Sequence, residues 1–256
     1  MVDTTIYEQP ANELLRACLR VEHLFTQLDY HYQNCISIYH VRITIRLLIE
    51  ILNVLDRPDL KSKLSQEFQR VNAIFDKLES TPAISQEQLE KTRQELNQSV
   101  DYLTSIYGKL GQSLRENPFI NNIRNHLTAN GGDSPFETPA YHRWLQLPRQ
   151  EQYQYLTNWI QLLNPIRQSI NLLLKIIRNS TQAEQVEAQR GFYHCSLPTY
   201  PPIQLVLIEF NDQYLSYPEI SVGRHRLNVC FYQLNTEDRP EQLESDFNFK
   251  LSLCRI

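Results

Sequence analysis

The sequence lacks the cysteine spacing of a disulfide framework or a structural metal site. Its five cysteines are odd in number, and no two form a CxxC pair. That usage is typical of reduced thiols in a cytosolic protein. His31 and Cys35 lie four residues apart and could offer two metal ligands on a helix, but no second pair accompanies them. We therefore expect neither a metal nor another cofactor.

Export and membrane signals are also missing. The opening MVDTTIYEQP has no basic region followed by an apolar run, so no signal peptide is expected. No window reaches the roughly 18 uninterrupted apolar residues of a membrane-spanning helix. The most hydrophobic stretch is broken by Arg42, Arg46 and Glu50. We expect a cytoplasmic protein without membrane insertion.

The common catalytic motifs are absent. There is no GxxxxGK[ST], GxGxxG, GxSxG or HExxH. His142 could act as a general base, but no nucleophile lies near it in the sequence. A hydrolase built around His142 would need a second titrating group beside it. We expect no enzyme and assign no catalytic residues.

Basic charge is not in excess. Lysine and arginine total 25 against 29 acidic residues, a formal net charge of −4. Proteins that bind nucleic acid usually carry a basic excess, so nucleic acid is not an expected partner. A local basic patch stays possible, and a nucleic-acid or nucleotide-binding adaptor that uses it is the alternative function.

Glycine is scarce, and its distribution is uneven. Four of the six glycines and four of the thirteen prolines fall within residues 108–148. Residues 111–148, here called the central segment, also carry five arginine and histidine side chains: Arg115, Arg124, His126, His142 and Arg143. Bends at glycine and proline can bring such side chains together. We interpret the central segment as a bent junction between helices.

Apolar residues spaced three and four apart predict helices on both sides of this segment. The first begins near Asn12, and the second spans roughly residues 36–55 with an apolar surface wide enough for the centre of a bundle. Pro58 is placed in the first turn of a third helix, with Asp56 as its cap. A fourth follows a capping box at Ser85. Further helices are expected at 118–127, from Thr138-Pro139, and over 151–179, where Pro165 kinks a helix or begins a new one.

After Glu187 the apolar period falls towards two, which predicts strands over residues 191–195, 203–210, 224–234 and 246–255. No helical segment separates them, so an antiparallel sheet is expected. Residues 4–7 could add a strand to it. The predicted class is α+β, with an N-terminal helical bundle domain over 8–186 and a small antiparallel β-strand domain over 187–256.

Short motifs spread over nearly the whole chain resemble the ZapD family of bacterial cell-division proteins. In chain order they are YEQP at 7–10, NE at 12–13, LRVE at 19–22, GQxLRE at 111–116, GG at 131–132, Phe136, Pro139, HxWL at 142–145, LP at 147–148, WI at 159–160, LNP at 163–165, GFY at 191–193 and YPxIS at 217–221. The resemblance implies a homodimer that binds the C-terminal tail of FtsZ, the tubulin-like polymer of the division ring, and bundles its filaments at mid-cell.

The resemblance also implies which residues receive the tail. Arg20, Arg115, Arg124 and His142 match basic positions within the family's motifs, and Arg143 adjoins His142. Arg224 and Arg226, which flank His225, form a second basic cluster in the β-strand domain. The planar guanidinium can hold a carboxylate through two hydrogen bonds. One exposed ion pair contributes at most about 1 kcal/mol, so binding is expected to be weak per site and sensitive to salt.

Overall fold

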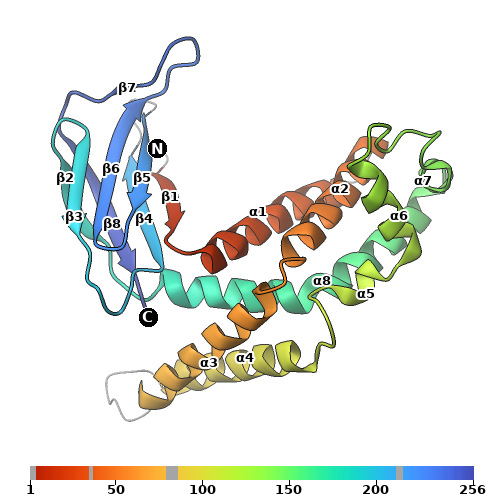
Figure 1. Ribbon diagram of the computed structural model, residues 1–256, viewed down its shortest axis with the longest axis horizontal. Helices are drawn as coiled ribbons and strands as arrows, with labels where there is room; N and C mark the ends of the chain where they lie inside the picture. Colours follow the sequence, from red (N-terminus) through yellow and green to blue (C-terminus); the bar gives the residue numbers. More distant parts are fainter. Residues whose placement is uncertain (1–3, 35–36, 79–85, 212–215) are drawn as a thin grey trace. The chain divides into compact units, whose positions relative to one another are not determined.

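The computed structural model describes residues 4–34, 37–78, 86–211 and 216–256 (Figure 1). Its contacts divide the chain into two compact units. The helical unit is Ala17–Leu173, and the β unit joins Met1–Arg16 to Leu174–Ile256. Both parts of the predicted α+β class are present, and each unit is described by itself.

Three long helices supply most of the apolar interior of the helical unit: α1 (Glu13–Gln33), α2 (Ile38–Leu55) and α8 (Arg149–Arg178). The Asn12 side chain accepts a hydrogen bond from the Leu15 N–H at 2.9 Å and so caps the start of α1. Ten side chains of α2 are buried, as expected for a central helix. Pro165 lies inside α8, which continues through it as one helix.

Helices α3 (Leu60–Leu78) and α4 (Gln86–Ser105) form an antiparallel pair (Figure 1). Leu64 and Phe68 of α3, and Leu96 and Leu103 of α4, are completely buried. The predicted start of α3 was wrong, because the helix begins at Leu60 and Asp56 is instead the C-cap of α2. Ser85, proposed as part of a capping box, lies outside the described residues.

The central segment holds the short helices α5 (Gln112–Arg115), α6 (Pro118–Leu127) and α7 (Pro139–Trp144). Asn117 caps α6 by accepting hydrogen bonds from the N–H groups of Phe119 and Ile120. Gly111 precedes α5 with φ of 71°, and a Cβ there would stand 2.9 Å from Leu52 Cδ2. A left-handed conformation and close packing both favour glycine at this position.

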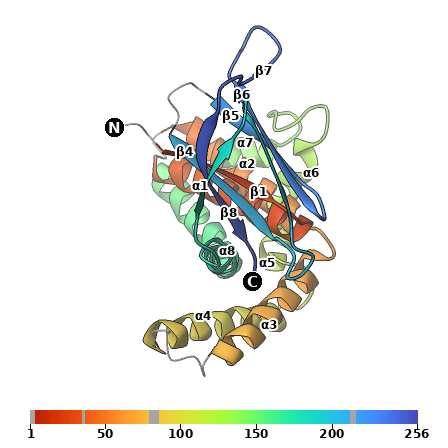
Figure 2. The same ribbon diagram turned by 90° about the vertical axis from the view of Figure 1, so that its left-hand side faces the viewer.

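The β unit contains two antiparallel sheets where the sequence predicted one (Figure 2). One sheet has the order β1-β4-β8-β2, and the other has β3-β6-β5 with β7 also pairing β6. The strands are β1 (Thr4–Pro10), β2 (Glu184–Ala188), β3 (Phe192–Ser196), β4 (Leu205–Asn211), β5 (Ser216–Val222), β6 (Arg226–Gln233), β7 (Glu241–Gln242) and β8 (Phe247–Cys254).

The two sheets share one apolar core. Ile208 from β4, Val229 from β6 and Phe249 from β8 belong to the same buried cluster. The rings of Phe210 and Phe231, one from each sheet, meet edge to face with centroids 5.5 Å apart. Facing sheets with a shared core make a small sandwich.

The N-terminal strand lies in the first of these sheets. β1 pairs with β4 in antiparallel register, from Thr4 opposite Asn211 to Pro10 opposite Leu205. Arg178 donates two hydrogen bonds to the Glu8 carboxylate, from Nε to Oε1 and from Nη2 to Oε2, each at 2.7 Å. The last turn of α8 is thereby joined to β1.

Candidate functional site

Arg115 lies at a buried junction of helices in the central segment. Its side chain is 8% exposed and bonds to Asp56 at 3.0 Å. It also donates to the carbonyl oxygens of Leu52 at 2.6 Å and Leu110 at 3.1 Å. These carbonyls belong to the end of α2 and to the turn before α5. The Arg115 guanidinium therefore links two backbone segments.

Arg124 reaches the same carboxylate from α6. It donates to Asp56 Oδ2 at 2.6 Å and to Asn53 Oδ1 at 2.7 Å. Lys109 donates to Asp56 Oδ1 at 2.8 Å. We call Asp56, Lys109, Arg115 and Arg124 the Asp56 cluster. Three cations against one carboxylate leave an excess of two positive charges there.

The electrostatics of the Asp56 cluster favour the ionised carboxylate. The pKa of Asp56 is lowered to about 2, chiefly by the hydrogen bond from Lys109. Partial burial opposes this shift, and the hydrogen bond from Arg124 adds to it. Burial also lowers the pKa of Arg115, while the charge of Asp56 counteracts it. Since an arginine side chain stays protonated in proteins, the cluster keeps its positive excess at neutral pH.

His142 and Arg143 form a second group, on α7. Both side chains are exposed, and both contact Gln146: Nε2 of His142 lies 3.1 Å from its amide nitrogen, and Arg143 donates to its amide oxygen at 3.2 Å. The buried residues Tyr141 and Trp144 hold α7 in place. The centroids of the Trp144 ring and the Trp159 ring of α8 lie 5.6 Å apart, so α7 is packed against α8 beneath its exposed side chains.

The other predicted basic residues belong to other elements of the chain. Arg20 is an exposed residue of α1, in the helical unit. Arg224 and Arg226 are exposed at the turn between β5 and β6, in the β unit. That turn is closed by a hydrogen bond of 2.8 Å from the Gly223 N–H to the Arg226 carbonyl. Among the contacts of the described residues, none joins Arg20 to the Asp56 cluster.

Sequence reasoning missed two carboxylates that organise cations. One is Asp56, interpreted as a helix cap. The other is Asp133, which binds Arg42 at 3.3 Å and Arg46 at 2.9 Å. Arg42 and Arg46 were noted in the sequence only as breaks in the most hydrophobic stretch. Two features of the sequence could have indicated the Asp133 contact. Asp133 directly follows Gly131-Gly132, and Arg42 and Arg46 lie four residues apart on an otherwise apolar helix.

Metal and membrane features were searched within the described ranges. No group of three or more histidine, cysteine or acidic side chains in them could hold a metal ion. Cys35, the proposed partner of His31, falls outside those ranges. His194 is exposed, while its neighbour Cys195 is half-buried, as alternation along a strand predicts. Of the helices described, none has the length and apolar character needed to cross a membrane.

Comparison with known proteins identifies consistent relatives. A family model for ZapD, described as a cell division protein, matches residues 19–230. The chain is 38% identical to the cell division protein ZapD of Coxiella burnetii, over all of both chains. It is 34% identical to the protein of that name from Ralstonia nicotianae and 32% identical to the one from Azoarcus sp., each over 98% of this chain and 99% of the relative.

Proposed function

Because this chain belongs to the ZapD family of cell division proteins, we propose that it binds the C-terminal tail of FtsZ and cross-links FtsZ filaments. It acts as a cytoplasmic homodimer at the mid-cell division site, and it does so without catalysis. The family membership over the whole chain carries this proposal. A role in cell division follows from the family, and the FtsZ tail is the more specific part of the proposal.

The exposed cations support tail binding. Arg20, His142, Arg143, Arg224 and Arg226 all present their side chains to solvent. A carboxylate of an acidic tail can replace water on such groups without disturbing the fold. These five residues are therefore the ones we assign to direct contact with the tail.

Arg115 and Arg124 have a different part in this proposal. Their guanidinium groups already bind Asp56 and backbone or amide oxygens. They hold α2, α5 and α6 together and contribute positive potential to the surface that attracts the tail. Arg124 is 22% exposed and can also contribute an N–H to a bound carboxylate, whereas Arg115 is almost closed off.

Weak contacts suffice when they are multiplied. Each exposed ion pair contributes at most about 1 kcal/mol, and salt screens it. A homodimer offers two tail sites, and a filament offers many tails. Avidity then converts weak binding into stable bundles.

The test is co-sedimentation of the protein with FtsZ polymers. We expect the protein in the pellet, less of it at high salt, and little of it when the FtsZ tail is deleted. Arg20→Glu should reduce bundling while the dimer persists. Lys91→Glu is the matched control, because it makes the same charge change at an exposed site on α4. Undiminished co-sedimentation with tail-less FtsZ would refute the proposed mode of binding.

The alternative, an adaptor for nucleic acid or nucleotides that uses the same basic residues, draws support from the positive excess at the Asp56 cluster. It predicts a mobility shift of DNA or RNA that Arg20→Glu weakens. We expect no such shift at physiological salt, because the chain has a net charge of −4.

A further inference from the structure

Strands β2 and β3 are consecutive in the chain but belong to different sheets of the β unit. The end of β2 and the start of β3 lie side by side, because Gln189 and Phe192 form an antiparallel bridge. A tight turn with positive φ at Arg190 and Gly191 joins them. From there β2 runs along β8, and β3 runs along β6. The sandwich is therefore open between these two strands, which we call the β2–β3 fork.

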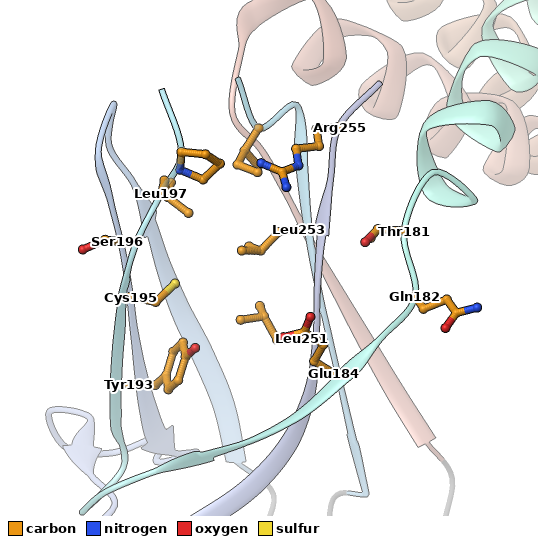
Figure 3. A pocket seen from close by; sticks show the side chains of 12 residues that line it. Thr181, Gln182, Glu184, Tyr193, Cys195, Ser196, Leu197, Leu251, Leu253 and Arg255 are labelled. Carbon is orange, nitrogen blue, oxygen red and sulfur yellow. The ribbon is translucent and has the colours of Figure 1, made fainter. Parts of the chain in front are cut away.

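The β2–β3 fork contains a cavity of about 590 Å³ (Figure 3). Tyr193, Cys195 and Leu197 of the β3 side project into it, and Leu251 and Leu253 of β8 lie at its back. Ser196 points away from the cavity, as strand alternation requires (Figure 3). The volume lies within the range of roughly 300–1,000 Å³ found for ligand sites.

One wall of the β2–β3 fork is a strand edge with free backbone groups. The Leu197 N–H donates to the His225 carbonyl at 2.9 Å, and the Phe231 N–H donates to the Gly191 carbonyl at 2.8 Å. Residues 191 and 197 thus turn their backbone towards β6. Because this direction alternates along an antiparallel strand, the N–H and C=O groups of His194 and Ser196 point away from β6. In the part of the chain that the structure describes, β3 pairs with β6 and with no second strand along its length.

Polar side chains stand at the entrance and on the wall. Arg255 is exposed at the end of β8 and lines the mouth of the cavity (Figure 3). Among the described residues, no acceptor lies on its guanidinium group. Burial, reinforced by the neighbouring Cys195 thiol, raises the pKa of Tyr193 to about 12, so its hydroxyl stays neutral. Glu184 is the acidic residue among those lining the cavity.

We propose that the β2–β3 fork binds an extended peptide of another protein, which pairs with the free edge of β3 and places a carboxylate against Arg255. The peptide backbone bonds to His194 and Ser196, and its alternate side chains enter the cavity over Leu251 and Leu253. This is strand addition, in which backbone bonds give affinity and pockets for alternate side chains give specificity. The proposal stands apart from tail binding by the exposed cations.

The combination of features selects this occupant. A small apolar molecule would fill the cavity but leave the His194 and Ser196 backbone groups without a partner. A peptide strand fills the cavity and also bonds to these backbone groups. It covers a strand edge that could otherwise pair with the edge of another sheet. Its carboxylate, from an acidic side chain or a chain terminus, complements Arg255.

The experiment begins with a displayed library of random peptides of about ten residues with free carboxyl termini, selected on the full chain. We expect the enriched peptides to carry apolar residues at alternate positions and a carboxylate near one end. A fluorescent synthetic copy of one of them then reports affinity by anisotropy. No enrichment over a blank support, or enrichment without this pattern, would overturn the proposal.

Two pairs of variants test the contacts. Ser196→Pro removes an N–H that points away from β6, so the sheet retains its own hydrogen bonds. Ser196→Pro should lower the affinity for the peptide about tenfold, while Ser196→Ala should leave the affinity unchanged. Arg255→Gln should weaken it about three- to tenfold, and Arg239→Gln, an exposed arginine outside the cavity lining, should not. Equal binding by Ser196→Pro and Ser196→Ala would contradict strand addition.

A further measurement covers the case in which Ser196→Pro fails to fold. Two peptides can be made, one methylated on the backbone nitrogens of its odd-numbered residues and the other on those of its even-numbered residues. One of the two should fail to bind the unaltered protein, and the other should bind as the unmethylated peptide does. Equal binding by both peptides would contradict edge pairing. If Ser196→Pro instead converts the dimer to monomers, a second copy of the chain occupies the β2–β3 fork, and the proposal fails.

Discussion

Asp56 stands at the C-terminal end of α2, where the carbonyl groups of the last turn already concentrate partial negative charge. A carboxylate added at that end attracts cations strongly. Three cations approach it from different places: Lys109 from the segment between α4 and α5, Arg115 from α5 and Arg124 from α6. One short side chain thus determines how the end of α2 meets the central segment.

The first prediction concerns Asp56 and pH. Its pKa is about 2 in the folded chain against a usual value of 3.8, so the folded state favours the ionised form. This contribution to stability is complete above about pH 4 and is lost as pH falls through 2. With allowance for solvent screening it amounts to about 1–2 kcal/mol. Urea unfolding should show Asp56→Asn less stable by that amount at pH 7, with the difference shrinking between pH 4 and 2. A difference independent of pH would show that the carboxylate charge is not the cause.

The second prediction compares two glycines that both have positive φ. Gly111 has φ of 71°, and a Cβ there would meet Leu52 at 2.9 Å, whereas Gly132 has φ of 58° with nothing within 4 Å. Gly132→Ala should cost about 1 kcal/mol of unfolding free energy from backbone strain alone. Gly111→Ala should cost about 1–3 kcal/mol more, because Leu52 must also move. Equal losses in denaturant unfolding would exclude the packing term.

At the scale of elements, the third prediction concerns the attachment of β1. Arg178, in the last turn of α8, binds Glu8 of β1 through two hydrogen bonds, and both side chains are about one-quarter exposed. Glu8→Gln should lower the free energy of local opening of β1 by about 1 kcal/mol. Faster hydrogen exchange along the β1–β4 ladder would report it. Glu13→Gln, in the more exposed pair with Arg16, is the control and should leave this exchange unchanged.

Helices of this chain were easier to predict than strands. Pro118 and Pro139 each sit at a first helical position, so α6 and α7 begin where the sequence indicates. β2 was missed because Glu184-Gln185-Val186-Glu187 is mostly polar, as an edge strand can be. β5 carries Pro218 in its interior, which argues against a strand in general but is tolerated at a sheet edge.

The division into two sheets and the Asp56 cluster share one reason for escaping prediction. Both depend on contacts between residues far apart in sequence; Arg124 and Asp56, for example, are 68 positions apart. Local periodicity identifies which side chains are apolar or charged, but not which of them meet. The sequence could nominate Arg115 and Arg124 as cations of one region. It could not show that they face a carboxylate of α2 rather than solvent.

At the scale of the whole molecule, the fourth prediction tests cross-linking by a dimer, and it rests on the proposed function. In a mixed dimer, the protomer that carries Arg20→Glu supplies a tail site with weakened binding, and its partner supplies a working site. If protomers associate at random, an equal mixture leaves about one-quarter of the dimers with two working sites. Light scattering from FtsZ bundles should then fall further than the total binding does. A fall in scattering that is merely proportional to the wild-type fraction would contradict cross-linking by pairs.

The pairing of β1 with β4 sets an order of events during synthesis. Residues 17–173 form the helical unit from one continuous stretch, which can fold while the ribosome is still adding the rest. β1 leaves the ribosome first among the described elements, yet its partner strand emerges about 200 residues later. Until then Thr4–Pro10 is an unpaired strand on a nascent chain, and the β unit is completed last. We therefore expect newly made protein to pass through a stage in which the helical unit is folded and residues 4–10 still lack their partner strand.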